Sequence, residues 1–373
     1  MKQYPSRMIG WRATFAGAAC LFIAGSSQAQ SVTLYGLIDT AVEHLSSTAA
    51  GGSLTRMPGL TAGLPSRLGV RGSEDLGDGL KAVFTLEQGL APDSGALNQG
   101  GRGWGRQAFV GLAGSWGTIS LGRQYTMTYW SQLDADLLGP AMYSSSSLDS
   151  YLPNARADNA VAYRGTFDSL TVGGTYSLGR DAVNAGPSPS GTNCAGESST
   201  DTLACREWSV MLKYDRPTWG ASAAIDEQRG GPGAFAGLTS SAMKDRRSIL
   251  AGWFKPDQAL KLGVGLIARR NDGSPATPRS NLWYAGAAYT LDQHWLLEAE
   301  AFRLGYKDSA NGATLLAVRA SYLFSKRTTV YATAGHIAND GALALSASGA
   351  AAGGTPVAGG SQTGLALGLR HSF

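Results

Sequence analysis

Apolar and small polar side chains alternate along this chain in one segment after another. In the segment 170–178, one face would hold Leu170, Val172, Gly174, Tyr176 and Leu178, and the other would hold Thr171, Gly173, Thr175 and Ser177. Segments 208–214 and 315–324 repeat the pattern, the second less cleanly. Because successive side chains of a β-strand point to opposite faces, a period of two predicts strands with one apolar and one polar face.

Each alternating segment is about ten residues long, the length that a tilted strand needs to cross the hydrocarbon of a membrane. One such segment is weak evidence, because half-buried strands of soluble proteins alternate too. The repetition favours a membrane protein over the alternative of a soluble, exported β-sandwich. A sheet in lipid must close, since an open edge leaves backbone N–H and C=O groups unpaired where no water reaches them.

Connections between the segments are of two kinds, short turns and longer polar loops. The turns are 74–79, 114–117, 166–169, 216–219, 255–259, 292–293 and 325–327, and the loops lie near 45–62, 92–104, 125–157, 181–206, 231–244, 271–280, 308–312 and 339–361. Short turns on one rim and longer loops on the other are typical of outer-membrane barrels. The segments number about sixteen, which predicts an all-β transmembrane antiparallel barrel over residues 30–373. A barrel of that size is too wide for side chains to fill, so a water-filled channel is expected.

The first 29 residues predict a signal peptide that is removed on export. Its basic residues are Lys2, Arg7 and Arg12. The apolar stretch Ala13 to Ala24 is too short to span a bilayer, and Ser27 to Ala29 form a small-x-small cleavage site. A lipoprotein anchor on Cys20 is the rival interpretation, but the apolar region continues beyond that residue.

Charge and cysteine content agree with an exported protein. The chain has 31 Lys and Arg against 27 Asp and Glu, and removal of the leader leaves 28 against 27. This balance gives no reason to expect a nucleic-acid partner. The mature chain keeps Cys194 and Cys205, eleven positions apart in a Gly- and Ser-rich stretch. A loop-closing disulfide is expected there, with two free thiols as the alternative.

Seven sequence blocks resemble the general diffusion porins of Gram-negative outer membranes, most closely the beta-proteobacterial type. The blocks are Ser31-Val-Thr-Leu-Tyr-Gly36 with Asp39, Ser66 to Gly77, Leu80 to Glu87, Arg106 to Leu112, Leu121 to Tyr125, Ser325 to Thr328 and Gly368 to Phe373. They span nearly the whole mature chain. The resemblance implies a sixteen-stranded homotrimer in the outer membrane, in contact with lipid and lipopolysaccharide, that passes ions and small hydrophilic solutes.

The resemblance also implies that the third extracellular loop folds into the lumen and narrows it. Residues Gln124 to Arg156 occupy the place of that loop. The terminal Phe373 resembles the signal read by the outer-membrane assembly machinery.

Basic residues on the inner faces of the early strands are the candidates for the wall of the constriction. Parity places Arg67 and Arg71 on the lumen side if Leu68 and Val70 face lipid, and by the same rule Lys81 and Glu87 face inward. Arg106 points inward if Phe109 points to lipid. The expected wall set is Arg67, Arg71, Lys81, Arg106, Arg123 and Arg164, of which Arg67, Arg106 and Arg123 match wall arginines of the family.

Family porins place carboxylates on the loop opposite this wall, and Asp134 and Asp136 are the acids available. Opposed guanidinium and carboxylate groups would set a transverse field across the pore. The chain departs from the family at two places: the Pro-Glu-Phe-type loop motif is absent, and Ala162 stands where a basic residue is frequent. The ion preference expected from this set is a slight lean towards anions.

The same residues allow other interpretations. Any of these arginines could instead pair with nearby acids to hold the loop, and Arg71, followed by Glu74 and Asp75, is the first candidate. Tyr125, Tyr129, Trp130 and Tyr143 could form a sugar-stacking track in a substrate-specific porin, and the long Gly- and Ser-rich loops could serve surface adhesion. Enzyme motifs are not found, the four histidines are scattered singly, and neither cofactor nor metal is expected.

Overall fold

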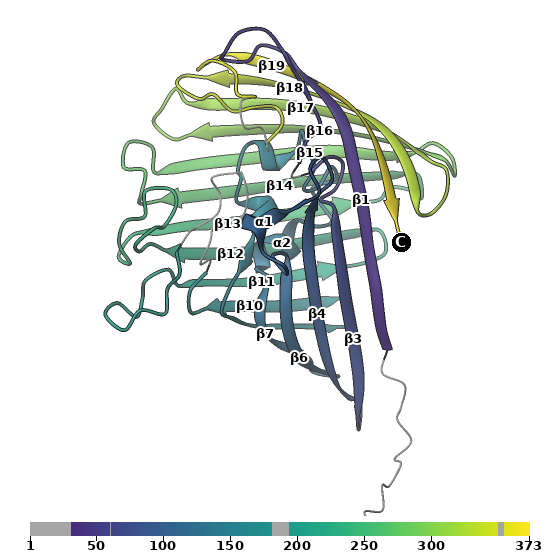
Figure 1. The fold of residues 1–373 in the computed structure, drawn as a ribbon, viewed down its shortest axis with the longest axis vertical. Coiled ribbons are helices and arrows are strands. Elements are labelled where there is room, and N and C mark those ends of the chain that lie inside the picture. The colour runs from purple at the N-terminus through teal and green to yellow at the C-terminus, as the bar shows by residue number, and fades with distance from the viewer. Residues whose placement is uncertain (1–30, 60, 181–193, 350–353) are drawn as a thin grey trace, which may run out of the picture.

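The chain forms a closed antiparallel barrel in the computed structural model, which describes residues 31–59, 61–180, 194–349 and 354–373 (Figure 1). Within these residues sixteen long strands make the wall. They are β1 (Ser31–Leu45), β3 (Arg67–Gly77), β4 (Leu80–Ala91), β6 (Gln107–Gly114), β7 (Gly117–Tyr125), β9 (Ala160–Phe167), β10 (Leu170–Ser177), β11 (Glu207–Asp215), β12 (Trp219–Arg229), β13 (Lys244–Phe254), β14 (Leu260–Asn271), β15 (Arg279–Thr290), β16 (Trp295–Tyr306), β17 (Gly312–Leu323), β18 (Thr328–Asp340) and β19 (Ser361–Ser372). The predicted fold class is confirmed. The leader, 1–29, lies outside the described residues, so the signal peptide stays a prediction.

Closure is made by the first and last strands. Strand β1 pairs with β19 on one side and with β3 on the other, with Val42 opposite Leu367 and Leu34 opposite Val70. Phe373 continues this pairing, since its backbone N–H donates to the Gly36 carbonyl over 3.0 Å and its carbonyl accepts from the Gly36 N–H over 3.2 Å. No edge therefore remains between the two ends of the described sheet.

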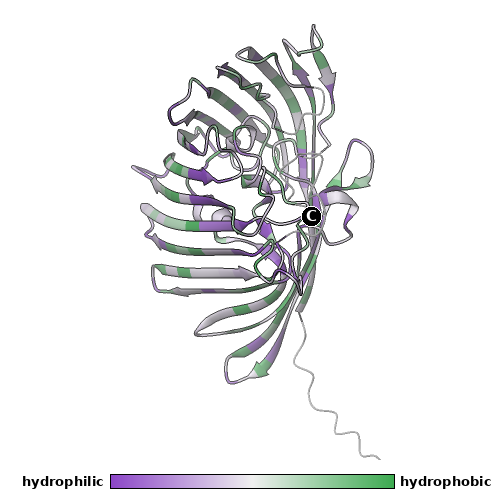
Figure 2. Ribbon diagram, turned by 90° about the vertical axis from the view of Figure 1, so that its left-hand side faces the viewer, coloured by the Kyte–Doolittle hydropathy of each residue, from purple (hydrophilic) through white to green (hydrophobic). Residues whose placement is uncertain are grey.

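The two faces of each strand meet different surroundings, as the alternation predicts. On β11, Val210 and Leu212 are 46% and 53% exposed, whereas Ser209 and Met211 are buried. Figure 2 shows the same alternation as hydrophobic and hydrophilic bands along the strands. Large apolar side chains exposed on the outside of a barrel are suited to hydrocarbon. None of the helices in the described part of the chain is long and apolar enough to cross a bilayer.

Short turns and long loops separate onto opposite rims, which sets the orientation of the barrel. The β3–β4 turn needs only Asp78 and Gly79, both at positive φ. The longer connections hold the remaining elements, which are β2 (Leu54–Arg56), β5 (Ala96–Leu97), α1 (Asn98–Gly101), α2 (Met127–Gln132), η1 (Ser145–Ser147), η2 (Leu152–Asn154) and β8 (Arg156–Ala157). The structure joins Cys194 and Cys205 in a disulfide in the connection between β10 and β11. We take the rim with the longer loops as the extracellular one.

The third long connection, residues 126–159, folds into the barrel, where α2 is seen in Figure 1. The Thr128 hydroxyl donates to Asp226 on β12 over 2.9 Å, and the Leu138 N–H donates to Glu300 on β16 over 2.9 Å. Farther along the loop, the Tyr143 ring is fully buried against Gly364 on β19, where a Cβ would lie 2.4 Å from the ring. The loop therefore covers the inner face of the wall from β10 to β19, as predicted for a constriction loop.

Candidate functional site in the barrel lumen

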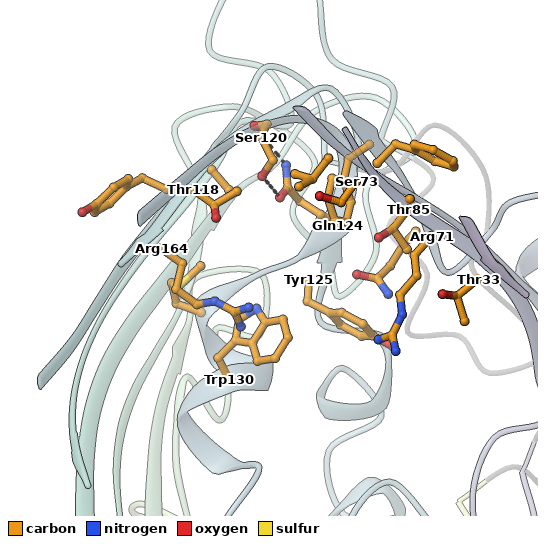
Figure 3. Close-up of a pocket in the computed structure, with 18 of the residues that line it drawn as sticks. Thr33, Arg71, Ser73, Thr85, Thr118, Ser120, Gln124, Tyr125, Trp130 and Arg164 are labelled. Carbon is orange, nitrogen blue, oxygen red and sulfur yellow. Dashed lines mark hydrogen bonds between the residues drawn. The ribbon is translucent and has the colours of Figure 1, made fainter. Parts of the chain in front are cut away.

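Part of the lumen beside the start of the loop is bordered by β1, β3, β4, β6, β7 and β9. A cavity of about 380 Å³ lies there between these strands and the start of the loop (Figure 3). Six of the residues that line it carry small hydroxyl side chains, and they are Ser31, Thr33, Ser73, Thr85, Thr118 and Ser120. Such a lining gives water and dissolved solutes hydrogen-bonding partners along the wall.

Two arginines reach this cavity from opposite sides. Arg71 stands on β3 opposite Thr85 of β4, and Arg164 stands on β9 opposite Thr118 of β7. Figure 3 shows both side chains with Tyr125 and Trp130 between them. The Arg164 guanidinium lies 3.6 Å from the centroid of the Trp130 ring, which holds its direction by a cation–π contact.

Neither Arg71 nor Arg164 forms an ion pair with any carboxylate among the residues that the structure describes. The alternative interpretation, in which Arg71 pairs with Glu74 or Asp75, is therefore wrong, since Arg71 instead lies 5.3 Å from the centroid of the Tyr35 ring. Uncompensated charge beside a water-filled cavity acts on passing ions more strongly than charge already cancelled by a bound partner.

Glu87 gathers a second group of arginines on the same wall. Arg106 is almost fully buried, and its Nε donates to Glu87 over 2.7 Å. Arg67 lies 3.8 Å from the other carboxylate oxygen, to which the Tyr35 hydroxyl donates over 2.9 Å. The structure thus brings together two of the predicted wall arginines, Arg67 and Arg106, but one acid in contact with both partly cancels their charge.

Arg156, at the end of the infolded loop, joins this group and was not predicted from the sequence. Its guanidinium lies 4.8 Å from the centroid of the Tyr125 ring, and its Nη2 donates to the Tyr125 hydroxyl over 3.3 Å. Arg106 donates to the same hydroxyl over 2.6 Å. Burial lowers the pKa of the Arg156 guanidinium, and the charges of Arg106 and Arg123 lower it further. Strand parity does not extend into a loop, so alternation could not have found this residue.

Arg123 does not reach the open lumen, contrary to the prediction. It stands opposite Ala108 on the face of β7 that carries the exposed Leu121. Its Nε donates to the Gly105 carbonyl over 2.7 Å, and its Nη1 pairs with Asp158. These contacts tie the second and third loops together at the extracellular rim, which is a structural role.

Two further details of the predicted wall are corrected. Phe109 stands opposite Thr85 and faces the lumen, while Val110 next to it is exposed outside. Arg106 still points inward, because it precedes the first residue of β6 and does not follow the parity of that strand. Lys81 is an exposed side chain opposite Asp75 beside the periplasmic turn, so it belongs to the mouth of the barrel and not to its narrow part.

The two candidate loop acids do not face the arginine wall. Asp134 pairs with Lys213 on β11, and Lys213 also lies 3.2 Å from Asp215. Asp136 is enclosed by the loop, accepting hydrogen bonds from the Ser145 hydroxyl over 2.6 Å and from the Gly139 N–H over 3.0 Å. Burial raises the pKa of Asp136 to about 6. The expected transverse field between wall arginines and loop carboxylates is therefore not formed by these residues.

The loop aromatics cover one another instead of lining a track. Tyr125 and Tyr129 stack with ring centroids 3.9 Å apart, and Trp130 meets Tyr129 edge-on at 5.2 Å. Tyr143 is fully buried against the wall. Continuous stacking of a sugar ring would need open aromatic faces, so the geometry disfavours that alternative. Among the described residues no group of His, Cys, Asp and Glu is arranged to hold a metal ion.

Comparison with known proteins agrees with this geometry. A family model described as Gram-negative porin matches residues 13–342. The chain belongs to this family. It is 30% identical to outer membrane porin protein 32 of Delftia acidovorans over 95% of this chain and 98% of that protein. It is also 29% identical to an outer membrane porin of Bordetella pertussis over 74% of this chain and 71% of that protein.

Solved structures lead to the same family. An anion-selective porin from Comamonas acidovorans superposes with a TM-score of 0.71 and 25% identity, covering 92% of this chain and 100% of that one. OmpT of Vibrio cholerae in a trimer form gives a TM-score of 0.62 at 18% identity, which shows the fold alone. The porin is accordingly an outer-membrane channel for passive diffusion, and the proteins of its family are channels and not enzymes.

Proposed function

We propose that this porin prefers anions more strongly than its sequence alone indicates. The observation that supports the proposal is the opposed pair Arg71 and Arg164, which border the 380 Å³ cavity without a carboxylate partner among the described residues. The candidate loop acids that would have balanced them are bound elsewhere, Asp134 by Lys213 and Asp136 inside the loop. Positive charge at a narrow aqueous gap concentrates anions and repels cations.

Partial compensation farther along the wall is consistent with this preference. Glu87 is shared by Arg67 and Arg106, and Arg156 adds a further positive charge beside them. Two arginines sharing one carboxylate leave a net positive wall. The structural relative from Comamonas acidovorans is described as anion-selective, which supports the same preference here.

The proposal includes a homotrimer in contact with lipopolysaccharide. The outer faces of β1, β6 and β7 carry the exposed apolar side chains Val32, Leu34, Val110, Leu112, Ile119 and Leu121, which can pack against lipid or a neighbouring barrel. A fold relative in trimer form supports the same assembly. The role of Phe373 as an assembly signal is part of the proposal. The residue lies where β1 and β19 pair, and it is 45% exposed.

Planar-bilayer recording under a salt gradient tests the channel and its preference together. Insertion of wild-type protein should raise the ohmic current in steps, in groups of three for a trimer. The sign of the reversal potential should be the one expected when anions are more permeant than cations. A reversal potential of zero, or one with the sign of the cation, would overturn the proposed preference while leaving the channel itself in place.

A further inference from the structure

A row of positive side chains crosses the outside of the barrel at its extracellular end. Arg246 on β13 stands directly opposite Arg270 on β14, and Arg270 stands directly opposite Arg279 on β15. Lys307 extends the row at the end of β16, since its N–H donates to the Arg279 carbonyl over 2.9 Å. All four side chains are exposed, and they lie on the face that turns away from the lumen.

Such a row is costly by itself, because like charges placed directly opposite on neighbouring strands repel each other. Carboxylates relieve only part of the repulsion. Arg246 pairs with Glu227, and Arg270 lies 3.5 Å from Asp272. Arg279 and Lys307 form no ion pair within the described portion of the chain. The row therefore has an excess of positive charge that an external anion can neutralise.

The row forms the rim of a groove of about 590 Å³. Small residues on the four strands make its floor, and they are Ser248, Ala268, Asn281 and Gly305. Trp283 and Arg303 stand opposite each other at the next outward positions beyond Asn281 and Gly305, closer to the middle of the barrel, and Trp283 is 51% exposed. The groove is thus a hollow between large side chains and not a flat charged surface.

Below the groove the outward positions become apolar. Leu250 is 60% exposed on β13, and Val264 is 53% exposed on β14. Tryptophan is typical of the boundary between hydrocarbon and headgroups, and Trp283 stands between this apolar surface and the cationic row. The groove therefore lies at the level where the headgroups of the outer leaflet meet the protein.

We propose that this groove binds a phosphorylated lipid of the outer leaflet, with its phosphate held by Arg246, Arg270, Arg279 and Lys307. Guanidinium groups match phosphate oxygens with paired hydrogen bonds, and the acyl chains would descend over Leu250. The groove on β13 to β16 would then be one definite place of the proposed contact with lipopolysaccharide. It rests on the orientation of the barrel in the membrane and not on the ion preference of the pore.

The test uses folded, detergent-solubilised porin and lipid A carrying two phosphates as the probe. Native mass spectrometry measures how much lipid stays bound to wild type, to Arg270→Gln/Arg279→Gln and to Arg206→Gln/Arg216→Gln. The last variant removes the same charge from two arginines outside the groove, the half-buried Arg206 and the exposed Arg216. We expect the groove variant to bind lipid A at least tenfold more weakly, and the control variant to bind it as wild type does.

Dephosphorylated lipid A with the same acyl chains should bind wild type as weakly as lipid A binds the groove variant. If lipid A binds the groove variant as tightly as the control variant, the site is wrong. If wild type binds dephosphorylated lipid A as tightly as lipid A, the phosphate chemistry is wrong. If inorganic phosphate at millimolar concentration displaces lipid A, the groove is a free-anion site and the lipid assignment is wrong. Reversal potentials of the groove variant should remain those of wild type, so this test and that of the ion preference fail independently.

Discussion

Replacing Arg71 or Arg164 by glutamine should reduce the anion preference of the pore by a predictable amount. Both side chains border the same cavity, and a sphere of its 380 Å³ has a radius of about 4.5 Å. A unit charge on the wall is then about 4.5 Å from an ion at the centre. In bulk water the two charges interact by about 0.9 kcal/mol at that distance.

Salt reduces this energy. At 0.1 M ionic strength the Debye length is about 10 Å, which leaves about 0.6 kcal/mol per ion. An anion gains this energy and a cation loses it, so each arginine separates them by about 1.2 kcal/mol. Since about 1.4 kcal/mol is a factor of ten, each substitution should lower the ratio of anion to cation permeability between about five- and tenfold.

Reversal potentials under a potassium chloride gradient measure this ratio directly. Arg206→Gln serves as the matched control, because Arg206 lies outside the lumen and donates to the Tyr176 hydroxyl on the outer face. The effect of Arg71→Gln should shrink as the salt concentration rises. A ratio that stays within a factor of two of wild type in both lumen variants at 0.1 M salt would refute the electrostatic account of these two residues.

Three further outcomes follow from the same contacts. Glu87→Gln should lower the temperature at which the folded barrel converts to the unfolded band on a gel, because it leaves the charge of the buried Arg106 without its carboxylate partner at a cost of about 3–5 kcal/mol. A conversion temperature equal to that of wild type would contradict this. Gly364→Ala should raise open-channel current noise, since its Cβ would press on the buried tyrosine of the loop, whereas Gly174→Ala, with its nearest contact at 3.6 Å, should behave as wild type. Burial raises the pKa of Asp136 to about 6, so its carboxyl group holds a proton more tightly in the docked loop than in a loop exposed to water. Docking should weaken as pH rises from about 4 through 6, seen as more frequent closures at pH 7.5 than at pH 5, and Asp136→Asn should abolish that difference.

Strand faces were predictable because the period of two is a local property of the sequence. The exposed Val210 and the buried Met211 stand where alternation placed them, and the third loop lies inside the barrel as the family resemblance implied. The inward direction of Arg67, Arg71 and Arg164 follows from the same rule. Because the pattern repeats over many strands, the prediction of the fold was more secure than any one segment could make it.

Some errors in the predicted site occur where strand parity ceases to apply, and others where the inward face of a strand was assigned wrongly. Arg106 faces inward because it precedes β6, while Phe109 within that strand also faces inward. Arg123 follows its strand outward and meets Asp158 at the rim. The loop has no period at all, so neither the enclosure of Asp136 nor the approach of Arg156 to the wall could be derived from spacing.

The account depends on an aqueous path that runs between Arg71 and Arg164, and a cysteine at position 85 tests it with both arginines retained. Thr85 borders the cavity opposite Arg71, and the native Cys194 and Cys205 are joined in a disulfide. During conductance recording, Thr85→Cys should react with an anionic thiol reagent faster than with a cationic one of equal size, and each reaction should lower the current in a step. The outward Leu212→Cys should not react. Absence of any reaction at position 85, or faster reaction with the cationic reagent, would contradict the central claim.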